Sequence, residues 1–395
     1  MKTYKIVLYV AALFYLMLGS LPASAQSLDD NPYAKQSREA VEIAAKAGDA
    51  EAQFQWATRL FWDDLGGSGG NKGLAIPTEL VGERLALARP WYKKSASNGY
   101  GHAYAMLAVL LVTYDNKNPD AGEVSAYLEK GVALGSSLAK LNYAIWYIRD
   151  DERGSTALKY LLELEKEGGD DPTVSLQINE SLFEVYSYGM AGQKRDLQKA
   201  VVHGKKCAYA ESPSAYCQFL LARYYQNGWS GETDLEKAFT LFKSAAEQGE
   251  MRAQWRLGMA YLNGEGTKKG EKLAYQWVEK SAHQGYENGI VSFAVMNALG
   301  EGTDVNPEKA FEWYGKAAMN GSHHALRSIG FMIYLGDGVE ENQALGVATM
   351  IVAAEGDEGA GKNLRLWFDD YDDNEQVYKR EYALLIAQVR QKYGY

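Results

Sequence analysis

Few residues in this sequence have the types and spacing that chemistry requires. The 395-residue chain has only five histidines. Adjacent His323 and His324 resemble a metal-binding pair, but neighbours on a helix point about 100° apart and no carboxylate or cysteine accompanies them. We therefore expect no metal site there. His203, in the segment VVHGKKC, is expected at the surface of a helix.

The acidic and aromatic segment WFDDYDD, near the end of the chain, partly matches a calcium-binding loop. Asp370, Asp372 and Asn374 alternate as at the start of such a loop, and Glu381 falls at its twelfth position. Glu375 replaces the glycine that the turn at position six requires, and two basic residues fall inside the loop. Solvated acids at the start of a last helix are the favoured interpretation, with a bound cation as the alternative.

Catalytic motifs are also missing from the sequence. The glycine-containing turns GEG, GDG and GMAG follow expected helices rather than strands, so they do not match phosphate-binding loops. We find no serine elbow, no cysteine–histidine pair and no paired catalytic carboxylates. The sequence therefore predicts a protein that is not an enzyme and has neither catalytic residues nor a cofactor site.

What organises the chain instead is a repeat of 36 residues between positions 213 and 356. Three sets of residues keep this register. Turn glycines stand at Gly228, Gly264, Gly300 and Gly336. Glycines that end a second helix stand at Gly249, Gly285 and Gly321. Small residues stand at Ala238, Ala274, Ala310 and Gly346.

One period, residues 250–285, shows what each unit should be. Ala253, Leu257 and Tyr261 share one helix face, and Gly264 then ends this first-type helix. The following segment, EKLAYQWVEKSAHQG, carries the apolar stripe of a second-type helix. Such a helix–turn–helix cannot bury its apolar faces alone, so units must stack. The predicted fold is an all-α, right-handed superhelical solenoid with no sheet.

The first-type helices are expected to start near 50, 101, 136, 173, 214, 250, 286, 322 and 358, giving about nine units. The solenoid should span 37–356, with an insertion at about 63–78 that is either a functional loop or merely tolerated. A polar, flexible segment, 26–36, should precede it. Residues 357–395 should form a degenerate last repeat and a capping helix over 375–392.

Residues 1–25 have the pattern of a secretory signal. Lys2 and Lys5 precede an apolar stretch, and Ala23-Ser24-Ala25 is a small-x-small cleavage site. The alternative is an uncleaved membrane anchor, for which the apolar stretch is short. We expect cleavage before Gln26, no stable membrane anchor afterwards, and a periplasmic or secreted protein.

Several segments carry a family resemblance. AQWRLGMAYLNGEG, EKAFEWYGKAAMNG and LEKAFTLFKSAAEQG resemble the Sel1-like repeat, a relative of the tetratricopeptide repeats. The resemblance is strong over about 214–356 and weaker upstream to about 37. It implies a scaffold for protein interactions but does not identify a partner.

Cys207 and Cys217 are the only cysteines. After export to an oxidising compartment, two cysteines ten residues apart are expected to pair. Some exported Sel1-like proteins resemble this arrangement, with a bridge at the same corner between helices.

Charge and composition leave binding as the expected function. The net charge of −10 argues against nucleic acid or an anionic membrane as partner. We expect a monomer that binds a protein or peptide as a scaffold, adaptor or regulator in the cell envelope. One alternative is a secreted factor that engages a host protein. Another is a cell-wall ligand binder or hydrolase, since some disulfide-containing relatives are linked to β-lactam binding.

The related tetratricopeptide fold implies where a partner would bind, because first-type helices line its concave surface. Carried over to these units, that surface includes varied aromatic, aliphatic and arginine positions. They are Tyr216, Phe219, Arg223, Arg252, Trp255, Met259, Leu262, Val291, Val295, Arg327, Phe331 and Tyr334. Aromatic residues and arginine dominate interface energetics, so a groove centred on 216–262 is predicted to accept a peptide or helix. The alternative is that the apolar members pack between units as core.

Overall fold

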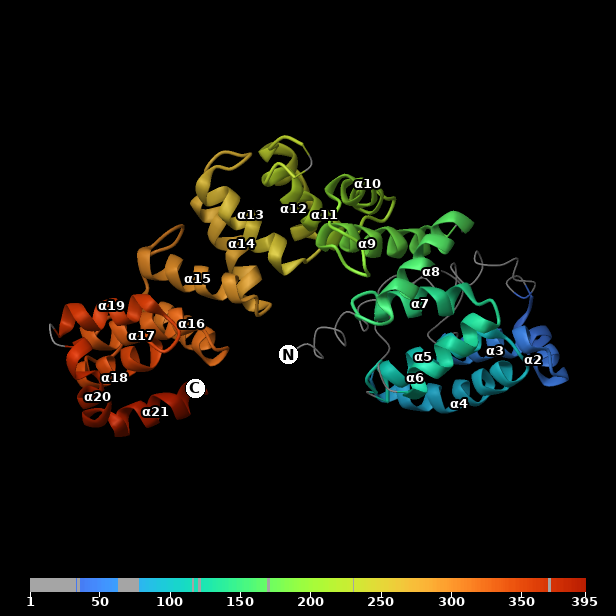
Figure 1. Cartoon of the computed structure of the whole chain (residues 1–395), viewed down its shortest axis with the longest axis horizontal. Coiled ribbons are helices and arrows are strands. Elements are labelled where there is room, and N and C mark those ends of the chain that lie inside the picture. The colour runs from blue at the N-terminus through green and yellow to red at the C-terminus, as the bar shows by residue number, and fades with distance from the viewer. Residues whose placement is uncertain are drawn as a thin grey trace. The chain divides into compact units, whose positions relative to one another are not determined.

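The computed structural model describes Tyr33 and residues 36–62, 78–115, 117–119, 122–168, 171–229, 231–368 and 371–395. All regular elements in these ranges are helices, which confirms the all-α prediction (Figure 1). The predicted signal sequence and nearly all of the insertion near 63–78 lie outside the described residues. Among the described helices, none combines the length and hydrophobicity needed to cross a bilayer.

The chain divides into two compact units, Met1–Ser214 and Ala215–Tyr395. The helices of the first unit are α2 (Arg38–Ala47), α3 (Ala50–Trp62), α4 (Thr78–Ser97), α5 (Gly101–Thr113), α6 (Gly122–Ala133), α7 (Ser137–Tyr147), α8 (Gly154–Glu167), α9 (Pro172–Tyr188) and α10 (Leu197–Ala208). Those of the second are α11 (Ala215–Gln226), α12 (Leu235–Glu247), α13 (Met251–Asn263), α14 (Glu271–His283), α15 (Glu287–Leu299), α16 (Pro307–Met319), α17 (His323–Leu335), α18 (Gln343–Ala353), α19 (Glu358–Trp367), α20 (Tyr371–Glu381) and α21 (Ala383–Tyr393).

The helices alternate as the repeat predicts. The nine first-type helices are the odd-numbered ones from α3 to α19, and each begins within one residue of its predicted start. Four of them, α11, α13, α15 and α17, begin 36 residues apart. In the second unit each first-type helix packs on the second-type helix that follows, and that helix packs on the next first-type helix. The prediction of a helix–turn–helix solenoid is confirmed.

Small residues allow the two helices of a repeat to approach closely. A Cβ added at Gly258 of α13 would lie 2.6 Å from Val278 Cγ2 and 3.1 Å from the Ala274 carbonyl oxygen of α14. A Cβ at Gly330 of α17 would lie 3.2 Å from the Gly346 carbonyl oxygen of α18. The 36-residue series of small residues therefore marks the line where the paired helices touch.

A second set of glycines joins one repeat to the next. Gly266, Gly302 and Gly338 stand 36 residues apart in the turn after a first-type helix, all with positive φ. A Cβ at these positions would meet the first residue of the preceding second-type helix, at 2.0 Å from Leu235 O, 2.2 Å from Glu271 O and 2.4 Å from Pro307 C respectively. The backbone of each turn is thus in close contact with the first residue of the preceding second-type helix.

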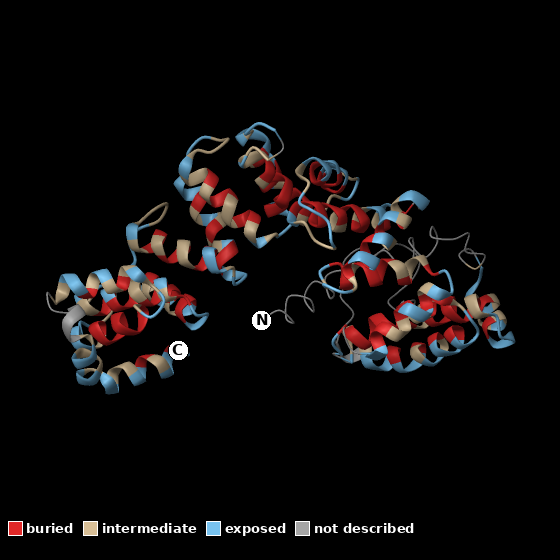
Figure 2. Ribbon diagram, viewed as in Figure 1, coloured by how far each residue is buried: buried red, intermediate tan, exposed pale blue. Residues whose placement is uncertain are grey.

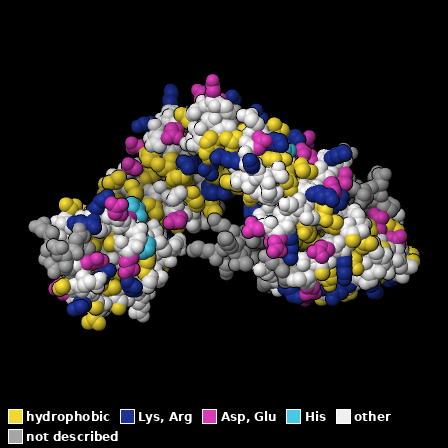
Figure 3. All heavy atoms as spheres, viewed as in Figure 1, with side chains coloured by type: hydrophobic (Ala, Val, Ile, Leu, Met, Phe, Trp, Pro, Cys, Tyr) yellow, Lys and Arg dark blue, Asp and Glu magenta, His cyan; other side chains and the backbone are white. Residues whose placement is uncertain are grey.

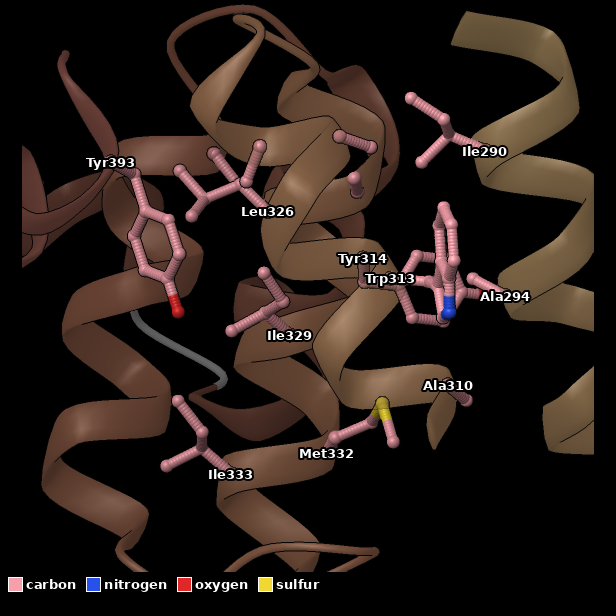
Figure 4. Close-up of a cluster of buried hydrophobic side chains, with 14 of the residues drawn as sticks. Ile290, Ala294, Ala310, Trp313, Tyr314, Leu326, Ile329, Met332, Ile333 and Tyr393 are labelled. Atoms are coloured by element: carbon pink, nitrogen blue, oxygen red, sulfur yellow. The ribbon is translucent and has the colours of Figure 1, made fainter. Parts of the chain in front are cut away.

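Buried residues follow one side of most helices, with exposed residues on the other side (Figure 2). In the second unit the core continues from α14 to α21. Trp313 lies beside Ala294, and Ile329 and Leu326 lie towards Tyr393 (Figure 4). The C-terminal helix is therefore a packed part of this unit.

The last segment differs from its prediction in one respect. A single helix was expected over 375–392, but α20 ends at Glu381 and α21 begins at Ala383. Helix α20 contacts α19, whereas α21 packs on α18 and α16. The break lets Val389 and Tyr393 of α21 enter the core.

Candidate partner-binding face

The predicted face on α11 and α13 begins with Arg252. Its guanidinium carbon lies 5.0 Å from the centre of the Tyr216 ring and 4.6 Å from that of Phe219, within the range of cation–π contacts. Arg252 also forms an ion pair with Glu250. Glu250 is itself held in place as the N-cap of α13, because its side chain accepts a hydrogen bond from the Arg252 backbone N–H. Arg252 is thus neutralised within the chain.

One helical turn further along the same two helices, Arg256 follows Arg252 and Arg223 follows Phe219. Both arginines are half-buried. Burial lowers the pKa of Arg256, and the nearby positive charge of Arg223 lowers it further. Within the described chain, no carboxylate lies within ion-pair distance of either guanidinium, whereas Arg252 has Glu250.

Aromatic rings lie against both arginines. The guanidinium carbon of Arg223 is 5.8 Å from the centre of the Trp229 ring, and that of Arg256 is 4.6 Å from the Trp255 ring. Trp255 is fixed by a 2.9 Å hydrogen bond from its indole Nε1 to Ser292 Oγ. We call Arg223, Trp229, Arg252, Trp255 and Arg256 the arginine–aromatic face. Figure 3 shows Lys and Arg side chains among hydrophobic ones over α11–α13.

One acid lies close to this face. Glu265 acts on Arg256 electrostatically and favours its charged form. Both oxygens of Glu265 accept amide hydrogen bonds, at 3.0 Å from Gln226 Nε2 and 3.2 Å from Asn263 Nδ2. Glu265 is therefore held in the turn after α13 by neutral donors and does not pair with an arginine.

Some residues predicted for this surface pack as core instead. Phe219 is only 5% exposed. Leu262, Val291 and Val295 are half-buried and pack against the core cluster of the second unit. Trp255 also touches that cluster. Met259 is half-buried and lies one turn after Trp255. The packing alternative therefore holds for most of the aliphatic members.

The predicted residues of α17 are used by the following repeat. Arg327 Nε lies 3.6 Å from Asp357 Oδ2. The Tyr334 ring stacks on the Trp367 ring of α19 at 4.0 Å between centres, and the Phe331 ring stacks on the same indole at 6.3 Å. The structure gives these three residues partners at α19 and does not bring them together with Arg223 and Arg256.

The structure corrects one expectation about the histidines. The expectation of a surface position for His203 is wrong, because this side chain is 7% exposed and its Nδ1 lies 3.0 Å from Asn179 Oδ1. Its ring also stacks on Tyr186. Where side chains are described, no group of three or more His, Cys, Asp or Glu residues could hold a metal. The side chains of residues 369–374, which include most of the acidic segment, lie outside that part of the chain.

Both cysteines, Cys207 and Cys217, are disulfide-bonded and fully buried. Cys207 lies near the end of α10 and Cys217 near the start of α11. The pairing expected from export is therefore present in the structure.

Two members of the face, Arg256 and Trp229, were missed from the sequence, and so was Tyr286, which contacts the face. Tyr286 packs edge-on against Trp255 with 5.9 Å between ring centres. The sequence did offer one indication of Arg256, since it lies four residues after Arg252 and so falls on the same side of the helix. Trp229 lies in a turn, where helix periodicity gives no information.

The fold defines the chain as a helical-repeat protein. A family model, the Sel1 repeat, matches residues 85–100, 181–208, 215–250, 252–286 and 294–322. The matched segments are Sel1 repeats, and Sel1-repeat proteins are scaffolds for protein interactions. No curated protein matches the sequence.

Solved structures with the same kind of repeat are similar to this chain. A Sel1 repeat protein from Oxalobacter formigenes is 23% identical, with a TM-score of 0.55 over 83% of this chain and 90% of that one. A protective antigen of uropathogenic Escherichia coli with an SLR fold is 18% identical, covers 91% and 95% of the two chains, and has a TM-score of 0.34. The first of these supports the fold alone.

Proposed function

We propose that this protein is an exported protein-binding scaffold of the cell envelope, an adaptor or regulator, that holds a segment of its partner on the arginine–aromatic face. The observation that carries the proposal is the pair of half-buried arginines on α11 and α13, each with a tryptophan ring against it and with no carboxylate of the described chain within ion-pair distance. Arginine and tryptophan are the residue types that contribute most to binding energy at interfaces.

The core packing of the solenoid does not explain these side chains. Positions that recur every 36 residues, such as Gly258 and Ala274, are accounted for by contacts between paired helices. Arg223 and Arg256 do not follow the repeat, since the residues one period later are Met259 and Ser292. Side chains that vary between repeats and remain partly accessible are available for recognition.

The cellular location in this proposal rests on two observations. The first 25 residues have the pattern of a secretory signal. The disulfide between Cys207 and Cys217 is of a kind that persists in oxidising compartments such as the periplasm.

Site-specific photo-crosslinking in cells that export the full chain tests this function. A photoreactive phenylalanine analogue at Met259, beside the face, should capture a partner protein in the periplasmic fraction. The same analogue at Lys243, which is exposed on the second-type helix α12, is the matched control. Equal capture at both positions, or no capture at Met259, would contradict the proposed face. Recovery of the adduct only in the medium would contradict the periplasmic location.

A further inference from the structure

We propose that Arg223 and Arg256 together form a subsite for a carboxylate of an acidic peptide segment in the partner. This inference rests on the proposed function and adds the chemistry by which the partner is recognised. The two guanidinium groups would bind one Asp or Glu side chain, or a C-terminal carboxylate, from opposite sides. The tryptophans would cover the apolar atoms next to that carboxylate.

Several other partly buried arginines have acceptors within the chain. In the described chain Arg59 and Arg84 lack a carboxylate but donate hydrogen bonds to backbone carbonyl oxygens. Arg252 pairs with Glu250, Arg327 with Asp357, and Arg89 with Asp115. Half-buried arginines are normally neutralised by an acid because uncompensated charge is expensive away from water. Arg223 and Arg256 instead repel each other as like charges, and this repulsion lowers the pKa of Arg256.

A hydrogen-bond donor without an acceptor gives a second, independent indication that a ligand binds here. Arg223 Nε is buried and has no hydrogen-bond partner in the described chain. A buried donor left unsatisfied destabilises the free protein, so an acceptor supplied by a ligand would be bound more strongly than one at a solvated site. Carboxylates can take two parallel hydrogen bonds from Nε and a terminal nitrogen of the same guanidinium.

The local charge favours a carboxylate over a phosphate. Arg223 and Arg256 contribute two positive charges, and Glu265 contributes one negative charge close to Arg256. Arg252 is already balanced by Glu250. One unit of positive charge remains, which matches a monoanion, whereas a phosphate group carries about −1.5 to −2 at neutral pH and would be repelled by Glu265.

The flanking rings indicate that the carboxylate belongs to a peptide with apolar neighbours. Trp229 and Trp255 present indole rings beside the two guanidiniums and are both half-buried. A short acidic peptide can place a carboxylate between the arginines and an adjacent apolar side chain against an indole ring.

A random dodecapeptide library selected on the full-length, oxidised protein tests the inference. Peptides selected by the wild type should be enriched in Asp and Glu. The best of them should bind at least about tenfold more weakly when its acids are changed to Asn or Gln. The same loss should occur when the original peptide meets the variant Arg223→Gln with Arg256→Gln, and binding should weaken as salt rises.

The matched control is Lys268→Gln with Lys269→Gln, which removes the same charge from an exposed turn of the same unit. This variant should bind the acidic peptide like the wild type. If it lost as much affinity as the double arginine variant, binding would depend only on the net charge of the protein, and the proposed subsite would be wrong. If the double arginine variant fails to fold, Arg223→Lys with Arg256→Lys replaces it. It should still weaken binding, because lysine cannot form the two-point contact.

The remaining outcomes separate the two proposals. Selected peptides that lack acids, or that bind equally well without the two arginines, would overturn the carboxylate subsite and leave the binding face intact. Tighter binding by at least about tenfold when phosphoserine replaces the essential acid would overturn it in favour of phosphate. Selection of no peptide at all, together with no crosslink at Met259, would overturn both.

Discussion

The glycines that join neighbouring repeats allow a sharp test of how this solenoid is held together. Gly264 and Gly266 lie two residues apart in the turn after α13, and both have positive φ, +76° and +67°. Alanine at either position must adopt a left-handed conformation, which costs about 1 kcal/mol. The two substitutions therefore share the same backbone penalty.

They differ in what the new methyl group would meet. At Gly264 the nearest atom is Lys269 Cγ at 3.1 Å, part of a flexible side chain that can move. At Gly266 it is the Leu235 carbonyl oxygen at 2.0 Å, followed by the Leu235 carbonyl carbon at 2.5 Å. Leu235 is the first residue of α12, so the start of a helix in the preceding repeat would have to shift.

We expect Gly264→Ala to lower the free energy of unfolding by about 1 kcal/mol. Gly266→Ala should lower it by about 2–4 kcal/mol, because overpacking against a fixed backbone adds about 1–3 kcal/mol to the same penalty. Urea denaturation followed by circular dichroism at 222 nm measures the loss. Hydrogen exchange of the first turn of α12 locates it, since that turn should open more readily in Gly266→Ala only.

Equal losses for the two variants would refute this reasoning, because the contact with Leu235 would then contribute nothing. An unchanged exchange rate in α12 alongside a large loss at Gly266 would place the strain elsewhere. Gly302→Ala repeats the test one period later, since its methyl group would lie 2.2 Å from Glu271 O.

Three further predictions concern charge, pH and the disulfide. Arg252→Met should lower the free energy of unfolding by about 1–2 kcal/mol, because it removes an ion pair and cation–π contacts. Arg256→Met also removes a cation–π contact, with Trp255, but it relieves the burial of an unpaired charge and the repulsion by Arg223, so the free energy of unfolding should stay unchanged or rise by up to about 1 kcal/mol. Urea midpoints of the two variants compare them, and a larger loss for Arg256→Met would contradict the assignment of repulsion. Burial lowers the pKa of His203, so the folded state binds a proton less readily than the unfolded state, and stability falls as the pH drops below about 6.5. In denaturant titrations, His203→Gln should make the free energy of unfolding less dependent on pH between about pH 7 and 5. An unaltered pH dependence in this variant would count against the prediction. Cys207→Ala with Cys217→Ala should lower the free energy of unfolding by about 2–3 kcal/mol on the chain-entropy model. A reductant should lower the stability of the wild type to that of the variant and leave the variant unaffected. A variant as stable as the oxidised wild type would contradict this prediction.

Most of the fold could be predicted from the sequence because the repeat shows the same constraint several times. Gly258 and Ala274 touch across one hairpin, and Gly330 and Gly346 touch across another 72 residues later. A residue that must be small because a backbone lies against it cannot be replaced by a larger one. It therefore recurs at the same position of each repeat and is visible in the sequence. The break between α20 and α21 had no such repetition, because it depends on Val389 and Tyr393 reaching the core.

Burial of single polar side chains could not be predicted in this way. His203 stands in a helix whose sequence, VVHGKKC, shows two lysines close by and suggests a solvated side. Its burial comes from α9, where Asn179 supplies a hydrogen-bond partner and Tyr186 a stacked ring. These residues lie 24 and 17 positions earlier in the chain, and no periodic pattern connects them with His203.

The binding face shows why a repeat both helps and hinders prediction. Arg223 and Arg252 were predicted because they fall on the face carried over from the tetratricopeptide fold. The structure then distinguished them, since Arg252 is neutralised by Glu250 while Arg223 is not. Arg256 was overlooked because the matching residues of the other units, Leu220 and Ser292, are unremarkable. Only the structure shows that Arg223 of α11 lies close enough to Arg256 of α13 to act on it electrostatically. In a stacked array, binding residues are therefore best sought as neighbours across adjacent first-type helices, because a ligand contacts two repeats at once and the sequence register displays only one position at a time.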